Sequence, residues 1–272
     1  MDPILFALPD IESLKLFYQN ADAALAQQAA DWMPCLKKGC CTGDAYCSRH
    51  SMAASIAYTE MEALWDAIRG WPEANRRRAA EVARAQYDLA LAQTGLASKT
   101  EAETISLFEL KQFEEALSAG NHVCPILNDD PTSPDYNTCR AYAVRPLVCR
   151  AFGQAAVTVS RGKDSDGAEM MDAPFCGCDT AFAAAQEHPD HLFTNFTALK
   201  NILLEVAAPK VVGVGRVPLV AKPIPAWLVD LTDDSGDLTN PRDIFNSIRA
   251  MIIGTLKSYL PQVETLPGAA EV

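Results

Sequence analysis

Nine cysteines, gathered into three groups, constrain this chain of 272 residues more than any other feature of its sequence. The first group spans 35–47, the second spans 124–149, and the third is Cys176-Gly177-Cys178. Thiolates are soft ligands that bind zinc, copper(I) and iron–sulfur clusters in preference to hard cations, and four of them complete a zinc site or ligate a cluster. A fold that brings these groups together would therefore be built around a metal centre.

The alternatives to metal ligation are disulfides and buried apolar thiols. The N-terminus, Met1-Asp2-Pro3-Ile4, has no basic segment followed by a long apolar stretch, so we expect no signal peptide and a cytoplasmic protein. Thiols stay reduced in that compartment, and an odd number of cysteines leaves at least one over in a purely disulfide scheme. The sequence contains no CxxC pair, so the cysteine spacing is not that of a zinc ribbon. Cysteines that are merely buried in the core remain the other interpretation.

Net charge and composition exclude several classes of partner. The formal net charge of −12 argues against nucleic-acid binding and against docking on anionic lipid, both of which use a basic surface. No stretch approaches the roughly 18 apolar residues that a membrane span needs. The apolar share of 49% and charged share of 21% are those of a globular protein that can bury a core without a metal.

Helical periodicity dominates outside the cysteine groups. It predicts a mainly α fold: an irregular helical domain with a cysteine-rich loop region around a metal centre and at most a few short strands. Thr59 with Glu62, and Ser98 with Glu101, fit the pattern of capping boxes at two helix starts. Helices are predicted at 11–29, 59–69, from Pro72 onward, 98–119, 191–206 and after Asn240-Pro241.

The remaining segments predict irregular structure. Prolines and the run Asn128-Asp129-Asp130 indicate turns throughout 122–152. Residues 154–160 alternate as a short strand does, and 161–175 has the composition of a mobile Gly/Asp-rich loop. Valines interrupted by Pro and Gly over 208–227 indicate extended chain laid over the core.

We therefore expect an N-terminal helical segment at 1–34, a cysteine-cluster metal-binding domain at 35–180, and a C-terminal helical segment at 181–272 that packs on the same core. The last helix carries an apolar stripe that would pack within the chain or form a homodimer face. Its members are Ile244, Phe245, Ile248, Met251, Ile252, Leu256 and Tyr259.

The second cysteine group carries a family resemblance. Cys124-Pro125-Ile126-Leu127, followed at 139–152 by C-R-A-Y-A-V-R-P-L-V-C-R-A-F, resembles the CxxCxxCC (YkgJ-like) cysteine-cluster family of zinc- or iron-chelating domains. That family shows C-P-F/I-L, then C-x-I-Y-x-x-R-P-x-x-C-R-x-F/Y, after an N-terminal double cysteine. Cys40-Cys41 resembles the double cysteine, and Thr59-Glu60-Met61-Glu62 resembles the family's threonine-and-glutamate helix start. The resemblance covers roughly 35–178.

The resemblance implies a set of ligands, with departures. The family's two leading cysteines fall on Pro34 and Lys37 here, where the sequence offers Cys35 and, later, Cys47. Adjacent cysteines rarely ligate one metal together, so Cys40 and Cys41 either serve two metals or include one that packs inward. We expect the core ligands to be Cys41, Cys124, Cys139 and Cys149, followed by Cys35, Cys40 and Cys176, with Cys178 as the alternative to Cys176.

Nearby residues suggest how such a centre would be supported. Lys37, Lys38, Arg140 and Arg150 would moderate the negative charge of several thiolates. Arg145 and Arg150 would either brace the cluster loop or bind an anion. His122, two residues before Cys124, is a further candidate ligand, although a loop histidine is more often solvated.

The implied cofactor is an iron–sulfur cluster, with the 4Fe–4S type favoured, or zinc. The order of cysteine motifs is also similar to that of the flagellin lysine-N-methylases, which would imply a cluster and methyl transfer from S-adenosylmethionine. No glycine-rich nucleotide loop after a strand supports a methyl-donor site. The expected functions are thus a metal-binding protein used for redox or an unassigned reaction, a zinc-binding structural or interaction module, or a cluster-dependent methyltransferase-like enzyme.

Overall fold

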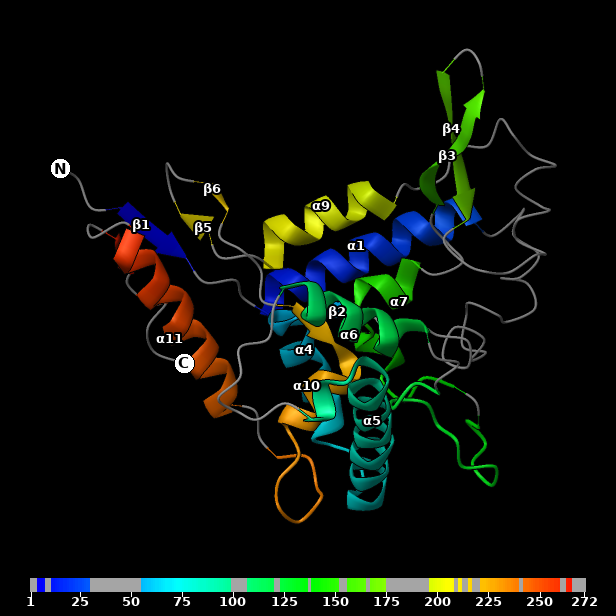
Figure 1. Cartoon of the computed structure of the whole chain (residues 1–272), viewed down its shortest axis with the longest axis vertical. Coiled ribbons are helices and arrows are strands. Elements are labelled where there is room, and N and C mark those ends of the chain that lie inside the picture. The colour runs from blue at the N-terminus through cyan, green and yellow to red at the C-terminus, as the bar shows by residue number, and fades with distance from the viewer. Residues whose placement is uncertain are drawn as a thin grey trace.

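The computed structural model describes residues 4–7, 11–29, 55–98, 107–119, 123–136, 138–151, 156–164, 167–174, 196–207, 210–211, 215–216, 221–239, 242–259 and 263–265. These residues form a mainly α fold, as predicted (Figure 1). The α-helices are α1 (Ile11–Ala29), α4 (Tyr58–Ile68), α5 (Glu73–Thr94), α6 (Leu107–Ala119), α7 (Leu147–Ala151), α9 (Phe196–Ala207), α10 (Ile224–Asp230) and α11 (Arg242–Tyr259). Two 3-10 turns are η1 (Leu96–Ser98) and η2 (Tyr142–Val144).

The strands are short and belong to three small sheets. They are β1 (Ile4–Ala7), β2 (Ser55–Ala57), β3 (Ala156–Asp164), β4 (Gly167–Pro174), β5 (Lys210–Val211), β6 (Gly215–Arg216), β7 (Ala221–Pro223) and β8 (Val263–Thr265). One sheet has the order β6-β5-β1-β8, so it joins β1 near one end of the chain to β8 near the other; β2 pairs with β7, and β3 with β4. Because β2 and β7 pair antiparallel, the start of α4 lies at the Ala57↔Ala221 end of this ladder and the start of α10 lies at the Ser55↔Pro223 end.

Local signals placed several helices correctly. Helix α1 begins directly after Asp10, and α11 begins directly after Pro241. The predicted capping box of Thr59 and Glu62 is wrong, because α4 begins at Tyr58 and Thr59 lies inside its first turn. Glu60, at the third helical position, instead accepts a hydrogen bond from the Ala57 backbone N–H at 3.1 Å. In the second predicted box, Ser98 ends a 3-10 turn and Glu101 lies outside the described residues.

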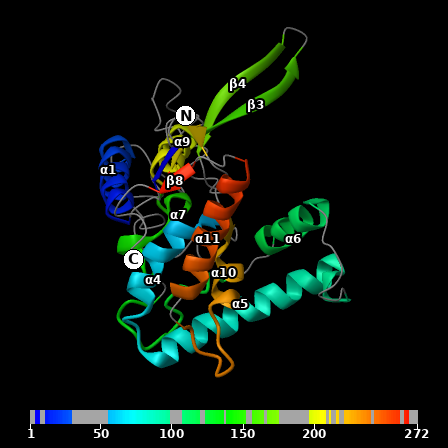
Figure 2. The same cartoon turned by 90° about the vertical axis from the view of Figure 1, so that its left-hand side faces the viewer.

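The interpretation of 161–175 as a loop is also wrong. Strands β3 and β4 pair antiparallel from Ala156↔Pro174 to Asp164↔Gly167, and the hairpin projects from the helical body (Figure 2). The register is irregular between Ser160 and Lys163, a stretch that contains Gly162. Glycine inside a strand commonly marks such an irregularity, so the residues that suggested a loop are accommodated within a ladder.

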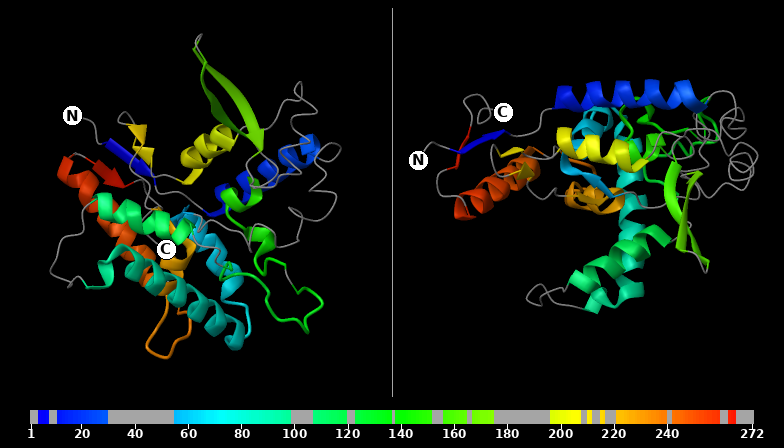
Figure 3. Two further views of the ribbon diagram at one scale, coloured as in Figure 1. Left: turned by 45° about the vertical axis from the view of Figure 1, so that its right-hand side comes forward. Right: turned by 90° about the horizontal axis from the view of Figure 1, so that it is seen from above.

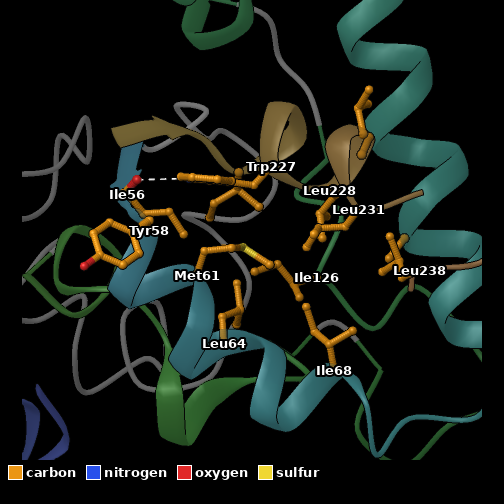
Figure 4. Close-up of a cluster of buried hydrophobic side chains, with 14 of the residues drawn as sticks. Ile56, Tyr58, Met61, Leu64, Ile68, Ile126, Trp227, Leu228, Leu231 and Leu238 are labelled. Carbon is orange, nitrogen blue, oxygen red and sulfur yellow. Dashed lines mark hydrogen bonds between the residues drawn. The ribbon is translucent and has the colours of Figure 1, made fainter. Parts of the chain in front are cut away.

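The first core cluster lies where α4, α5, α10 and α11 meet (Figure 4). Helix α4 contributes Met61, Leu64 and Ile68, which share one helical face. Trp227 of α10 is fully buried, and its indole N–H donates to the Ile56 carbonyl at 3.0 Å. The sequence had predicted extended chain as far as Trp227, but a helix begins at Ile224. Pro225 suits its first turn, where a missing N–H loses no intrahelical partner.

A second cluster forms between α1 and α9, which lie side by side (Figure 3). Leu14 and Leu25 of α1 pack there with Leu199 and Leu203 of α9. The short helix α7 connects the two clusters. Leu147 and Ala151 belong to the second cluster, whereas Val148 and Cys149 pack against the first. The position of α7 is therefore determined by apolar contacts on two sides.

The last helix places its apolar stripe against the first cluster. Phe245 and Ile252 are buried in it, and Ile244 and Ile248 pack against it partly buried, while Met251 is 55% exposed. The homodimer through this helix stays a prediction. Within the described ranges, no helix is long and apolar enough to cross a membrane.

Candidate metal centre

Three of the predicted ligands lie in described parts of the chain. Cys124, Cys139 and Cys149 are all partly buried, and all three pack against the first core cluster. His122 and the other six cysteines lie outside the described residues, so their roles stay predictions. These cysteines are Cys35, Cys40, Cys41, Cys47, Cys176 and Cys178.

Cys124 and Cys139 are presented on facing segments. The C-P-I-L sequence forms a turn in which the Leu127 N–H donates to the Cys124 carbonyl at 3.0 Å. Proline suits the second position of such a turn because its φ angle is preset. Leu127 then pairs with Cys139 in an antiparallel bridge, and the Arg140 N–H donates to the Ile126 carbonyl at 3.0 Å. Backbone hydrogen bonds therefore hold the Cys124 turn against the segment that carries Cys139.

Cys149 lies on α7, and a buried carboxylate anchors the start of that helix. Glu60 of α4 accepts a hydrogen bond from the Leu147 N–H at 2.9 Å and another from the Tyr18 hydroxyl at 2.8 Å. Together with the bond from Ala57, three donors surround this carboxylate. Glu60 of α4 thereby ties α1 to the start of α7, two residues before Cys149.

The environment of Glu60 shifts two pKa values. Burial raises the pKa of the Glu60 carboxyl, and the hydrogen bonds from Leu147, Ala57 and Tyr18 oppose this rise. Burial, followed by the negative charge of Glu60, raises the pKa of Tyr18 well above its ordinary value. The Tyr18 hydroxyl is therefore a permanent donor to Glu60 at physiological pH.

Arg150 braces the loop between Cys139 and Cys149. Its side chain is 2% exposed, its Nε donates to the Arg145 carbonyl at 2.7 Å, and its Nη2 donates to the Ala143 carbonyl at 2.5 Å. Nη1 pairs with Asp22 of α1, and the guanidinium lies 4.3 Å from the Tyr18 ring centroid. With its donors engaged by the protein, Arg150 fits the bracing role expected from the sequence and not anion binding.

Arg145 is buried in a different way. Arg145 is 7% exposed as a whole residue, and its guanidinium carbon lies 4.0 Å from the centroid of the Tyr142 ring. Within the described part of the protein, its buried Nε has no hydrogen-bond acceptor. The two arginines of the R-P-L-V-C-R segment therefore have unlike surroundings.

A cavity of about 510 Å³ opens beside Cys139. Its walls include the rings of Trp71 and Tyr142, and Arg140 and Asp135 bring charges of both signs to its lining. Cys139 is thus in contact with a space that a small solute can reach. This accessibility distinguishes it from a thiol that only fills the core.

The structure does not complete a metal site from these residues alone. Among the residues that it describes, no group of three or more His, Cys, Asp or Glu side chains is close enough to hold a metal ion. A centre that used Cys124, Cys139 or Cys149 would need ligands from the other cysteine groups.

Sequence reasoning missed the anchoring residues. Glu60 had a signal, since it lies in the threonine-and-glutamate segment, but that segment was interpreted as a capping box of Thr59 and Glu62. Tyr18 and Asp22 had none, because they lie on a helix that the sequence separates widely from α7. Comparison with family models, with curated proteins and with solved structures found no match to this chain.

Proposed function

We propose that this chain holds a thiolate-ligated metal centre, either an iron–sulfur cluster of the 4Fe–4S type or zinc. Cys124, Cys139 and Cys149 would be ligands, joined by cysteines from 35–41 and by Cys176. The observation that carries the proposal is the packing of three partly buried cysteines, from separate points of one loop region, against a single core cluster. The CxxCxxCC motif order supports it from the sequence.

The chemistry of the donors fits such a centre. The available donors are thiols, which are selective for soft metals, and cationic side chains lie in the same segment to offset thiolate charge. Backbone pairing supports Cys124 and Cys139, while the Glu60 and Arg150 interactions support Cys149. A site whose ligands are held before metal arrives loses less conformational entropy on binding.

The cysteine-rich and histidine-poor ligand set favours iron–sulfur over zinc. The whole chain has four histidines against nine cysteines. A bound cluster would supply electron transfer, and a bound zinc ion would supply structural stability. The protein's own residues hold the thiolates, exclude part of the solvent and balance the charge.

The first test is metal and sulfide analysis, with an ultraviolet–visible spectrum, of protein purified without oxygen. Iron with matching sulfide and a broad band near ~400 nm would support a cluster. Zinc without visible absorbance would support the second form of the proposal. Protein isolated under reducing conditions without metal would contradict both.

Cysteine variants test the assignment of the ligands. We expect Cys124→Ser, Cys139→Ser and Cys149→Ser each to lower the bound metal, because serine is a far weaker ligand for a soft metal. Full metal content in all three loop variants would refute the role of this loop.

A further inference from the structure

The cavity beside Cys139 has the size and the lining of a small-molecule site. Its volume of about 510 Å³ lies within the range of roughly 300–1,000 Å³ that is usual for ligand pockets. Two aromatic side chains, Trp71 and Tyr142, line it together with one cation, Arg140, and one carboxylate, Asp135. Ligand pockets commonly combine apolar walls with a few polar groups in this way. The lining therefore indicates which groups a ligand needs.

The two charged side chains of this lining are available to a ligand. Among the described residues, no hydrogen bond or ion pair uses the Arg140 guanidinium or the Asp135 carboxylate. Arg140 acts on Asp130 through space, but that carboxylate already accepts bonds from the Thr132 backbone N–H and hydroxyl, at 2.9 and 2.7 Å. Asp135 would repel a simple anion and Arg140 a simple cation. A ligand that carries both charges matches the pair.

The aromatic walls favour a planar or apolar group on the same ligand. The guanidinium carbon of Arg145 lies 4.0 Å from the centroid of the Tyr142 ring. A second cation on that ring would be repelled by Arg145, whereas an aromatic group would still gain from ring contact. Trp71 supplies the other ring, and its carbonyl accepts a hydrogen bond from Arg76 at 2.7 Å. The ammonium of a ligand is therefore expected at Asp135 and its apolar part at the two rings.

Backbone and side-chain hydrogen bonds hold the loop that forms one wall of the cavity. The Asn128 N–H donates to the Thr138 carbonyl at 2.8 Å, and the Asn128 side-chain amide donates to the Ser133 hydroxyl at 2.8 Å. The Thr138 hydroxyl donates to the Asp135 carbonyl at 2.7 Å. These bonds close the loop on itself on both sides of Asp135. A site held in this way before the ligand arrives loses less conformational entropy on binding.

We propose that this cavity binds a small zwitterion, namely an α-amino acid with an aromatic side chain. Its carboxylate would pair with Arg140, because a guanidinium offers a carboxylate two parallel hydrogen bonds. Its ammonium would pair with Asp135, and its ring would lie against Trp71 and Tyr142. The inference does not depend on the metal centre, because the groups assigned to the ligand all belong to described residues and none of them is a proposed metal ligand.

Isothermal titration calorimetry of the full chain with three probes tests which charges the ligand needs. L-Phenylalanine carries both charges, phenylpropanoate lacks the ammonium, and phenylethylamine lacks the carboxylate. L-Phenylalanine should bind saturably with a Kd below about 1 mM. Each of the other two probes should bind at least about 10-fold more weakly, because each leaves one charged side chain of the cavity without a partner.

Variants locate the ligand in the cavity. Arg140→Gln and Asp135→Asn should each weaken L-phenylalanine binding by about 5- to 10-fold. Arg140→Gln should leave phenylethylamine binding unchanged, and Asp135→Asn should not weaken phenylpropanoate binding, because each probe lacks the group that the altered side chain would bind. The controls are Lys111→Gln and Glu115→Gln, which remove the same charges from an exposed pair on α6 outside the cavity lining. Both controls should change affinity by less than about twofold.

The contrary results are distinct. A Kd for L-phenylalanine above about 1 mM would overturn the inference. Phenylpropanoate or phenylethylamine binding as tightly as L-phenylalanine would show that one charge suffices, and would overturn the zwitterion. Unchanged affinity in both Arg140→Gln and Asp135→Asn would place the ligand elsewhere. Circular dichroism checks that the variants fold, and the three probes on wild-type protein decide the matter if one does not.

Discussion

Replacement of Arg150 by methionine tests whether the interactions behind Cys149 hold the cysteine loop. Methionine keeps most of the apolar stem of the side chain but removes its hydrogen bonds to the Arg145 and Ala143 carbonyls and its ion pair with Asp22. It also removes the contact between the guanidinium and the Tyr18 ring. The change therefore removes the brace with little change in side-chain volume.

The expected loss follows from how each partner is solvated afterwards. Asp22 is 47% exposed and Ala143 is exposed, so both can bond to water and contribute little to the loss. The Arg145 carbonyl belongs to a buried residue, and a charged hydrogen bond of this kind contributes about 1.5–3 kcal/mol. The contact with Tyr18 adds about 2 kcal/mol, because both groups are buried away from water. We expect Arg150→Met to lower the free energy of unfolding by about 3–5 kcal/mol.

Urea unfolding of metal-free protein, followed by far-ultraviolet circular dichroism, measures this loss. The matched control is Arg249→Met, which breaks the pair between Arg249 of α11 and Glu62 of α4. Both variants should lose stability, but only Arg150→Met should also retain less metal. A free energy of unfolding for Arg150→Met within about 0.5 kcal/mol of the wild-type value would refute the reasoning.

Two further predictions concern the core. Because burial raises the pKa of Glu60 above its ordinary value of 4.5, the folded state holds this proton more tightly than the unfolded state does. The stabilisation from this tighter proton binding is complete below the unfolded-state pKa and is lost as pH rises through the folded-state pKa. Wild type should therefore lose stability relative to Glu60→Gln as pH rises. A pH-independent difference between the urea midpoints of the two proteins would contradict this. Trp227→Phe should cost about 2–4 kcal/mol in thermal or urea unfolding, because it leaves the buried Ile56 carbonyl without its donor and opens space in the core. Trp71→Phe, at a partly exposed site, is its control and should cost much less.

Helices with strong local signals could be predicted from the sequence. Asp10 precedes α1, and Asn240-Pro241 precedes α11. These signals act within one or two turns, where capping and side-chain periodicity determine the structure. The apolar stripe of α11 likewise identified Phe245 and Ile252, which the structure buries.

Segments without such signals could not be assigned. The strand predicted at 154–160 overlaps β3, but 161–175 was predicted as a loop from its glycines and charged residues, and the backbone pairing of β3 with β4 prevails over that composition. Helix α10 begins among prolines and valines that resemble extended chain, but burial of Trp227 and its neighbours in the core favours a helix there. Tertiary contacts outweighed weak local preference in both cases.

The sequence by itself determined that the protein is mainly helical, that its cysteines fall into three groups, and which loop carries the R-P-L-V-C-R segment. Only the tertiary structure decided what supports that loop. Glu60 bonds to Tyr18 across 42 residues and to Leu147 across 87, and Arg150 reaches Asp22 across 128. Hydrogen bonds over such separations leave no periodic or local pattern in the sequence, because their partners are brought together only when the helices pack.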